Sequence, residues 1–126
     1  MQSTSSTQPP REFEIVSTDV GGAPGVALRG EADIAAIPAL TEALDAAIRE
    51  TEGAFVIDLS ETEFLDSAGL STLLRARALL GREQRDLAVV CPPGPVRRLI
   101  DVAGVIDLLD LYRSRDALAA ALVPRA

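Results

Sequence analysis

Histidine, lysine and tryptophan are absent from this sequence of 126 residues, and cysteine occurs once, as Cys91. Without histidine, the chain cannot build a Ser-His-Asp nucleophile or a histidine-ligated zinc site. A single cysteine excludes an intrachain disulfide and a cysteine-rich metal site, and it indicates a reducing compartment. We therefore expect neither a metal nor a cofactor, and we interpret Cys91 as a small buried hydrophobe.

Positive charge is also scarce, because 12 arginines are outnumbered by 19 acidic residues and the net charge is −7. Nonspecific nucleic-acid binding takes most of its affinity from basic side chains, so we expect no direct contact with nucleic acid. No segment approaches the roughly 20 apolar residues of a membrane-spanning helix, and the N-terminus lacks the pattern of a signal peptide. The composition predicts a cytoplasmic protein that binds no membrane.

The length is typical of one domain. Residues 1–11 are rich in Ser, Thr, Gln and Pro and predict a disordered tail, which leaves 12–123 for the domain. Strands are expected at 13–16 and 26–28, joined by a glycine-rich hairpin loop, and then at 54–59, 87–91 and 105–111. Helices are expected at 37–48, 70–81, 95–103 and 114–122, with Ser114 capping the last. The predicted fold class is α/β, a mixed sheet of about five strands opened by a hairpin, with four helices packed against it in the order β-β-α-β-α-β-α-β-α.

Four arginines lie on the predicted second helix and in the loop after it, at Arg75, Arg77, Arg82 and Arg85. A run of like charges is usually a solvated face, and we interpret these side chains in that way. Whether the surface of Arg75, Arg77 and Arg82 contacts a partner stays open.

The segment FLDSAGL at residues 64–70 lies between a buried strand and an amphipathic helix. The first N–H groups of a helix lack intrahelical partners, and short oxygen-bearing side chains such as Asp66 and Ser67 accept hydrogen bonds from them. A cap of this kind contributes about 1 kcal/mol, and Gly69 is expected to relieve crowding near the sheet. Without a histidine as base, Ser67 is a poor nucleophile.

Phosphorylation of Ser67 suits this position better than catalysis does. A phosphate adds about −1.5 to −2 charges at a helix N-terminus, which accommodates an anion without unfolding. Asp66, Glu63 and Asp33 already make this surface acidic, so a partner fitted to a neutral hydroxyl would meet bulk and uncompensated charge. The turn is therefore suited to a switch that acts by local repulsion.

The same segment resembles the phosphorylation-loop motif of STAS domains in the bacterial anti-sigma factor antagonists. The resemblance extends over about residues 13–122 and includes the GEAD segment at 30–33 and the VIDLS segment at 56–60. It implies partner switching: the unphosphorylated antagonist binds an anti-sigma factor that is also a serine kinase, and a sigma factor is released. Phosphorylation by that kinase ends binding, and a serine phosphatase reverses it.

By this resemblance the phosphoacceptor is Ser67, its acidic neighbour is Asp66, and the aspartate of the Gly-x-x-Asp element is Asp33. Ala68 replaces a second serine that many members carry. The residues expected to bind the partner are Asp33, Asp66, Ser67, Ala68 and Gly69.

Two other functions compete with that of a binding module that is not an enzyme. STAS domains also serve as scaffolds of stress-sensing assemblies or as accessory subunits of membrane transport complexes, and this alternative stays open. A nucleotide-hydrolysing enzyme is disfavoured, because the chain has no lysine and no phosphate-binding loop.

Overall fold

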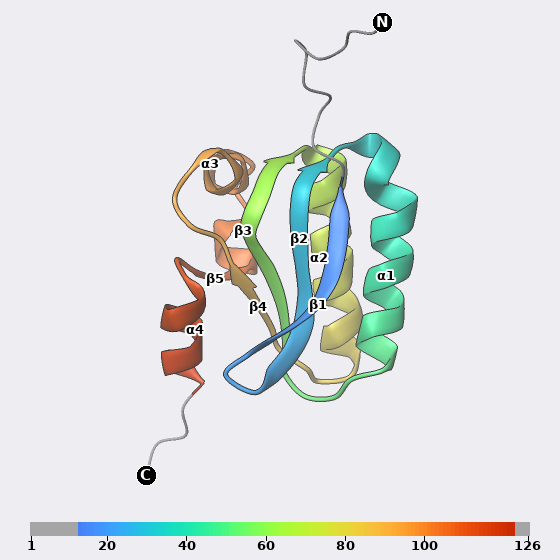
Figure 1. Ribbon diagram of the computed structural model, residues 1–126, viewed down its shortest axis with the longest axis vertical. Coiled ribbons are helices and arrows are strands. Elements are labelled where there is room, and N and C mark those ends of the chain that lie inside the picture. The colour runs from blue at the N-terminus through green and yellow to red at the C-terminus, as the bar shows by residue number, and fades with distance from the viewer. Residues whose placement is uncertain (1–12, 123–126) are drawn as a thin grey trace, which may run out of the picture.

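The computed structural model describes residues 13–122 as a five-stranded sheet with helices on both faces (Figure 1). Its strands are β1 (Glu14–Val20), β2 (Ala23–Ala32), β3 (Phe55–Leu65), β4 (Leu87–Val90) and β5 (Asp110–Tyr112). Its α-helices are α1 (Ile37–Arg49), α2 (Ser67–Arg82), α3 (Pro95–Val102) and α4 (Arg115–Ala121), and two short 3-10 helices are η2 (Ile34–Ala36) and η3 (Ile106–Leu108). The strand order is β1-β2-β3-β4-β5, with β1 antiparallel to β2 and the other neighbours parallel. The predicted mixed sheet with four α-helices is confirmed, whereas the predicted tail lies outside the described residues.

The opening hairpin turns through two glycines. Gly21 and Gly22 have φ angles of 60° and 92°, a conformation that glycine adopts without steric cost. The carboxylate of Asp19 accepts a hydrogen bond from the Gly22 N–H at 3.0 Å. The hairpin prediction is confirmed, and its strands are longer than expected because pairing continues to Val20 and Ala23.

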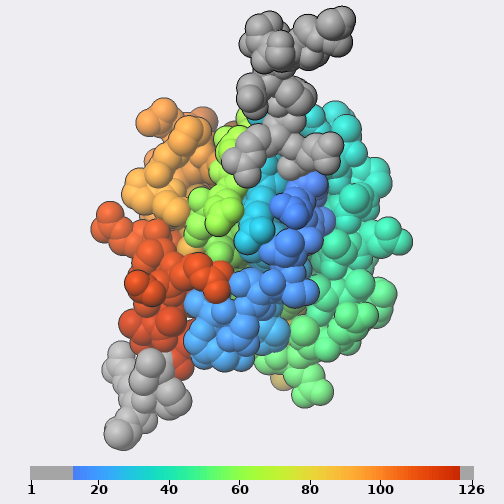
Figure 2. Space-filling model, in the orientation of Figure 1, coloured from blue at the N-terminus to red at the C-terminus, as the bar shows by residue number. Residues whose placement is uncertain are grey.

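Alternating side chains of the central strands fill two hydrophobic clusters, one on each face of the sheet. Phe55, Ile57 and Leu59 of β3 belong to the larger cluster, which also contains buried side chains of α1, α2 and α3. Val56 of β3 belongs to the smaller cluster, together with Leu118 of α4. Figure 2 shows that α4 covers only part of this second face, because β1, β2 and β3 reach the surface between α4 and α1.

Two predicted strands have different bounds in the structure. The strand expected at 54–59 continues to Leu65, so its polar second half is also part of the sheet. The strand expected at 105–111 is wrong over its first half, where η3 precedes a β5 of three residues. Ile106 and Leu109 both pack against the larger cluster, and a spacing of three residues fits a helical turn and not a strand.

The interpretation of Arg85 as a solvated charge is wrong. Its side chain is only 7 % exposed, and its guanidinium donates to the carbonyls of Ile48 and Gly53 and to the hydroxyl of Thr51 at 2.7–2.8 Å. These bonds close the C-terminal end of α1, where carbonyl groups lack intrahelical partners. Arg85 is therefore a structural residue.

The other three arginines, Arg75, Arg77 and Arg82, are exposed as predicted. Arg75 forms an ion pair with Asp45 at 2.7 Å, and its hydrogen bonds lower the pKa of that carboxyl. Cys91 is buried, as predicted, and burial raises the pKa of its thiol.

Candidate functional site

Asp66 is the single residue between β3 and α2. Its backbone is extended, with φ −100° and ψ −176°, and its carboxylate accepts a hydrogen bond from the Gly69 N–H at 2.9 Å. This geometry is that of a helix N-cap, in which a side-chain oxygen satisfies an N–H of the first turn. The predicted capping function belongs to Asp66.

Ser67 is the first residue of α2, a helix of 16 residues, and it is exposed. Because Asp66 already caps the helix, the Ser67 hydroxyl is not needed there. Within residues 13–122 this hydroxyl has no hydrogen-bond partner. Ser67 therefore presents a free hydroxyl to solvent at the positive end of the α2 dipole.

Asp33 occupies the same place at the end of the neighbouring strand. In the parallel ladder of β2 and β3 the last matched pair is Ala32 with Leu65, so Asp33 and Asp66 each follow a matched strand end. Asp33 is also an N-cap, since its carboxylate accepts from the Ala35 N–H at 3.1 Å with φ −93° and ψ −175°. The register therefore brings these two acidic caps to one edge of the sheet.

Gly69 allows α2 to lie close to the sheet. A Cβ atom at this position would lie 2.5 Å from Cδ1 of Leu65 and 3.4 Å from the carbonyl oxygen of Ala32. The predicted relief of crowding is confirmed. Gly69 is buried and Ala68 is half-buried, so of the three motif residues 67–69 it is Ser67 that is most open to a partner.

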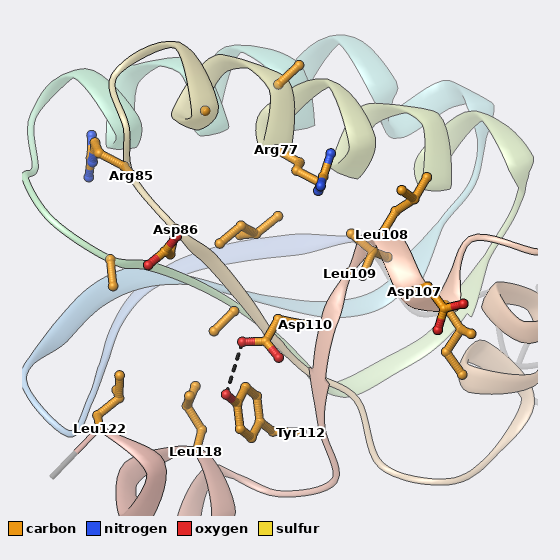
Figure 3. A pocket seen from close by; sticks show the side chains of 16 residues that line it. Arg77, Arg85, Asp86, Asp107, Leu108, Leu109, Asp110, Tyr112, Leu118 and Leu122 are labelled. Carbon is orange, nitrogen blue, oxygen red and sulfur yellow. Dashed lines mark hydrogen bonds between the residues drawn. The ribbon is translucent and has the colours of Figure 1, made fainter.

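A depression of the described surface, shown in Figure 3, has no residue of this turn in its lining. It has a volume of about 780 Å³ and is lined by the second half of α2, by β4 and β5, and by α4. Arg77 lies in its wall, ten residues beyond Ser67 and thus about 15 Å away along the helix. Tyr112 and Asp110 also line it, and the Tyr112 hydroxyl donates to Asp110 at 3.0 Å, which raises the pKa of Tyr112. The Ser67 turn is an open surface and not part of this depression.

Residues 13–122 contain neither a metal-binding cluster nor a membrane-spanning helix. No three acidic or cysteine side chains gather there in a group that suits a metal ion. No helix in that range has the length and apolar character needed to cross a membrane.

Comparisons with known proteins assign this geometry to a family. A family model described as "Mlab, STAS domain" matches residues 17–111. The anti-sigma-F factor antagonist RsfB of Mycobacterium tuberculosis is 31% identical over 110 residues, which are 86% of this chain and 89% of RsfB. The chain belongs to the STAS-domain family of anti-sigma factor antagonists. Anti-sigma factor antagonists are regulatory proteins and not enzymes, which agrees with the prediction of a non-enzymatic binding module.

Solved structures of STAS antagonists have the same fold. An anti-sigma factor antagonist from Mycobacterium paratuberculosis is 35% identical, with a TM-score of 0.79 over 90% of this chain and 97% of its own. The antagonist SpoIIAA in its unphosphorylated form is 17% identical, with a TM-score of 0.68 over 90% of this chain and 100% of its own. At that identity SpoIIAA supports the STAS fold alone.

Two exposed apolar side chains of this STAS domain have no function predicted from the sequence. Ile34 and Phe64 are 74% and 45% exposed, and they flank the acidic caps. A signal for Phe64 is present in the sequence, since it follows a polar run and is the first residue of the FLDSAGL motif. The sequence did not show that β3 extends to Leu65. Because successive side chains of a strand point to opposite faces of the sheet, the face on which Phe64 lies depends on that extension.

Proposed function

We propose that this chain is an anti-sigma factor antagonist that acts by partner switching. The unphosphorylated form binds an anti-sigma factor that is also a serine kinase, and a sigma factor is released. Phosphorylation of Ser67 by that kinase ends binding, and a serine phosphatase restores the binding form. The residues proposed to bind the partner are Asp33, Asp66, Ser67, Ala68 and Gly69; because Gly69 is buried, it contributes by setting the position of the helix start.

One observation carries the proposal: at the first position of α2, Ser67 offers an exposed hydroxyl that has no hydrogen-bond partner among residues 13–122, while Asp66 caps that helix. A kinase therefore has access to the hydroxyl without first breaking a structural hydrogen bond. A phosphate there lies near the free N–H groups and the positive end of the helix dipole, which favour an anion. Phosphorylation then changes the surface that a partner meets and leaves the fold intact.

The proposal is tested by intact mass after incubation with ATP and each candidate anti-sigma kinase of the source organism. Wild type is expected to gain one phosphate and Ser67→Ala none. Ser71→Ala is the matched control, because Ser71 is also an exposed serine of α2, one turn further along. Phosphorylation that persists in Ser67→Ala and stops in Ser71→Ala would contradict the assignment.

A binding assay with the same kinase tests the switch itself. Ser67→Ala is expected to bind persistently in the presence of ATP, whereas Ser67→Asp binds weakly. Treatment of the phosphorylated chain with a serine phosphatase is expected to restore binding. Equal binding by the two variants would refute partner switching. A stable complex whose Ser67 is never phosphorylated would favour a scaffold or accessory subunit.

A further inference from the structure

Two large apolar side chains remain exposed beside the Ser67 turn. Among residues 13–122, the large hydrophobic side chains with the greatest exposure are Ile34 at 74%, Phe64 at 45%, Val102 at 79% and Leu108 at 45%. Phe64 is paired with Glu31 in the ladder of β2 and β3, one position before the last matched pair. Ile34 lies two residues beyond Ala32, as Ser67 lies two residues beyond Leu65. The two apolar side chains therefore belong to the same strand ends as the proposed phosphorylation site.

Packing of the core does not account for Phe64. Leu65 is only 4% exposed and fills the larger cluster on the other face of β3. The other exposed residues in the second half of β3 are Ser60, Glu61 and Glu63, which are polar. A single exposed apolar residue on a surface is common. Two of them at neighbouring strand ends, next to a free serine hydroxyl, form a patch that a partner can bury.

Acidic side chains border this patch. Glu31 is the ladder partner of Phe64, and Asp33 directly precedes Ile34. Arg29, the arginine of β2, is already paired with Glu14 at 4.0 Å and with Glu61 at 3.3 Å. A surface complementary to the patch is therefore apolar at its centre and basic at its border, since complementary charge sets orientation and association rate.

We propose that Ile34 and Phe64 are the apolar anchors with which the unphosphorylated chain binds its anti-sigma factor, in an apolar socket bordered by basic side chains. This inference rests on the proposed function and adds the chemistry of its interface. A few side chains near the centre of an interface supply most of its binding energy, and an aromatic or aliphatic anchor buried in a pocket is one form that they take. Ile34 and Ser67 each lie two residues beyond the matched pair of Ala32 and Leu65, so the proposed interface and the serine share one edge of the sheet.

The anchors change the physical reason for release. We place Ser67 under the apolar centre of the socket and not at its basic border, so a phosphate there loses its water without gaining a cationic partner, and burying an unpaired charge is costly. Repulsion between exposed charges is screened by salt, since the Debye length falls to about 3 Å at about 1 M. Loss of hydration in a buried socket is screened far less. High salt is therefore expected not to restore binding of the phosphorylated chain.

The test measures Kd for the anti-sigma factor that Ser67→Ala binds in the preceding assay. Phe64→Ser and Ile34→Ser are each expected to weaken binding at least about tenfold. Leu108→Ser is the matched control, because Leu108 has the same 45% exposure as Phe64 but lies in the wall of the remote depression (Figure 3). Its Kd is expected to stay within about twofold of wild type, and thermal unfolding of each variant checks that the fold is retained.

The outcomes separate the inference from the function on which it rests. If Phe64→Ser and Ile34→Ser bind as Leu108→Ser does while phosphorylation still ends binding, the anchors are refuted and partner switching stands. Recovery of binding by the phosphorylated chain at about 1 M salt would refute release by desolvation. If neither wild type nor Ser67→Ala binds any anti-sigma factor of the source organism, the inference and the proposed function both fail.

Discussion

Replacing Asp66 with alanine tests whether the start of α2 depends on one side-chain hydrogen bond. The substitution removes the 2.9 Å bond to the Gly69 N–H and leaves an N–H of the first turn without a partner. Loss of an N-cap typically costs about 1 kcal/mol of folding free energy, within a range of about 0.5–2. An unfolding entropy of about 2.1 cal/mol/K per residue over residues 13–122 gives roughly 0.23 kcal/mol/K, so Tm should fall by about 4 °C.

Asparagine at the same position separates the cap from the charge. Asp66→Asn keeps a side-chain oxygen that accepts from the Gly69 N–H, and Asn caps helices about as well as Asp. Its Tm is expected within about 2 °C of wild type, the remaining loss coming from the missing charge at the helix N-terminus. Asp33→Ala is a second comparison with a smaller expected loss, because Asp33 caps a 3-10 helix of only three residues.

Thermal unfolding followed by circular dichroism or calorimetry measures all three variants under one condition. An Asp66→Asn variant that loses as much stability as Asp66→Ala would show that the hydrogen bond is not the source of the cap. An unchanged Tm for Asp66→Ala would refute the cap altogether. Because Asp66→Asn keeps the helix start, any loss of partner binding in this variant reports on charge and not on folding.

Three further substitutions or probes test the scaffold. Gly25→Ala is expected to lower the free energy of unfolding by about 3 kcal/mol, because its Cβ would lie 1.9 Å from the carbonyl oxygen of Val56; a denaturation midpoint equal to wild type would contradict this. Arg85→Ala should cost about 2 kcal/mol by leaving carbonyls at the end of α1 unsatisfied, and Arg85→Lys should not rescue the loss because one ammonium cannot replace the guanidinium fork. Urea denaturation measures the free energy of unfolding of both variants, and wild-type stability of Arg85→Lys would refute the requirement for a guanidinium group. Cys91 should resist alkylation in the native state near pH 8, since burial raises the pKa of its thiol and disfavours the thiolate, and it should react after unfolding. Rapid native labelling, followed by mass spectrometry, would show that the thiol is accessible.

The sequence predicted those parts of the fold whose signals are local. Apolar residues at helical spacing located α1 and α2, and the glycine pair located the hairpin. Ser114 caps α4 as predicted, its hydroxyl accepting from the Ala117 N–H at 3.0 Å. The motif likewise indicated a cap at the start of α2, and the structure assigns that bond to Asp66.

The remaining features depend on contacts between distant segments. The polar residues after Leu59 gave no sequence signal for the second half of β3. This half pairs with β2, and the ladder between the two strands contains two register shifts. Thr62 is buried there, and its hydroxyl is satisfied by donating a hydrogen bond to the carbonyl of Leu28 at 2.7 Å. Arg85 lies 37 residues from Ile48, and no local pattern distinguishes a buried arginine that closes a helix from a solvated one. The exposed pair of Ile34 and Phe64 depends on the same β2 and β3 register.

The single-residue link between β3 and α2 fixes the rotational phase of the helix. Each residue of an α-helix advances the chain by about 100°, so one residue inserted after Leu65 would rotate the first turn of α2 by that angle. Ser67 would then turn away from the edge it shares with Asp33, and Leu70 and Leu73 would leave the core. The direction in which Ser67 points is therefore set by the position at which β3 ends in the sheet. An insertion that lengthens the link between β3 and α2 would disrupt both the proposed phosphorylation switch at Ser67 and the packing of α2 on the sheet. Insertions in surface loops are tolerated more easily.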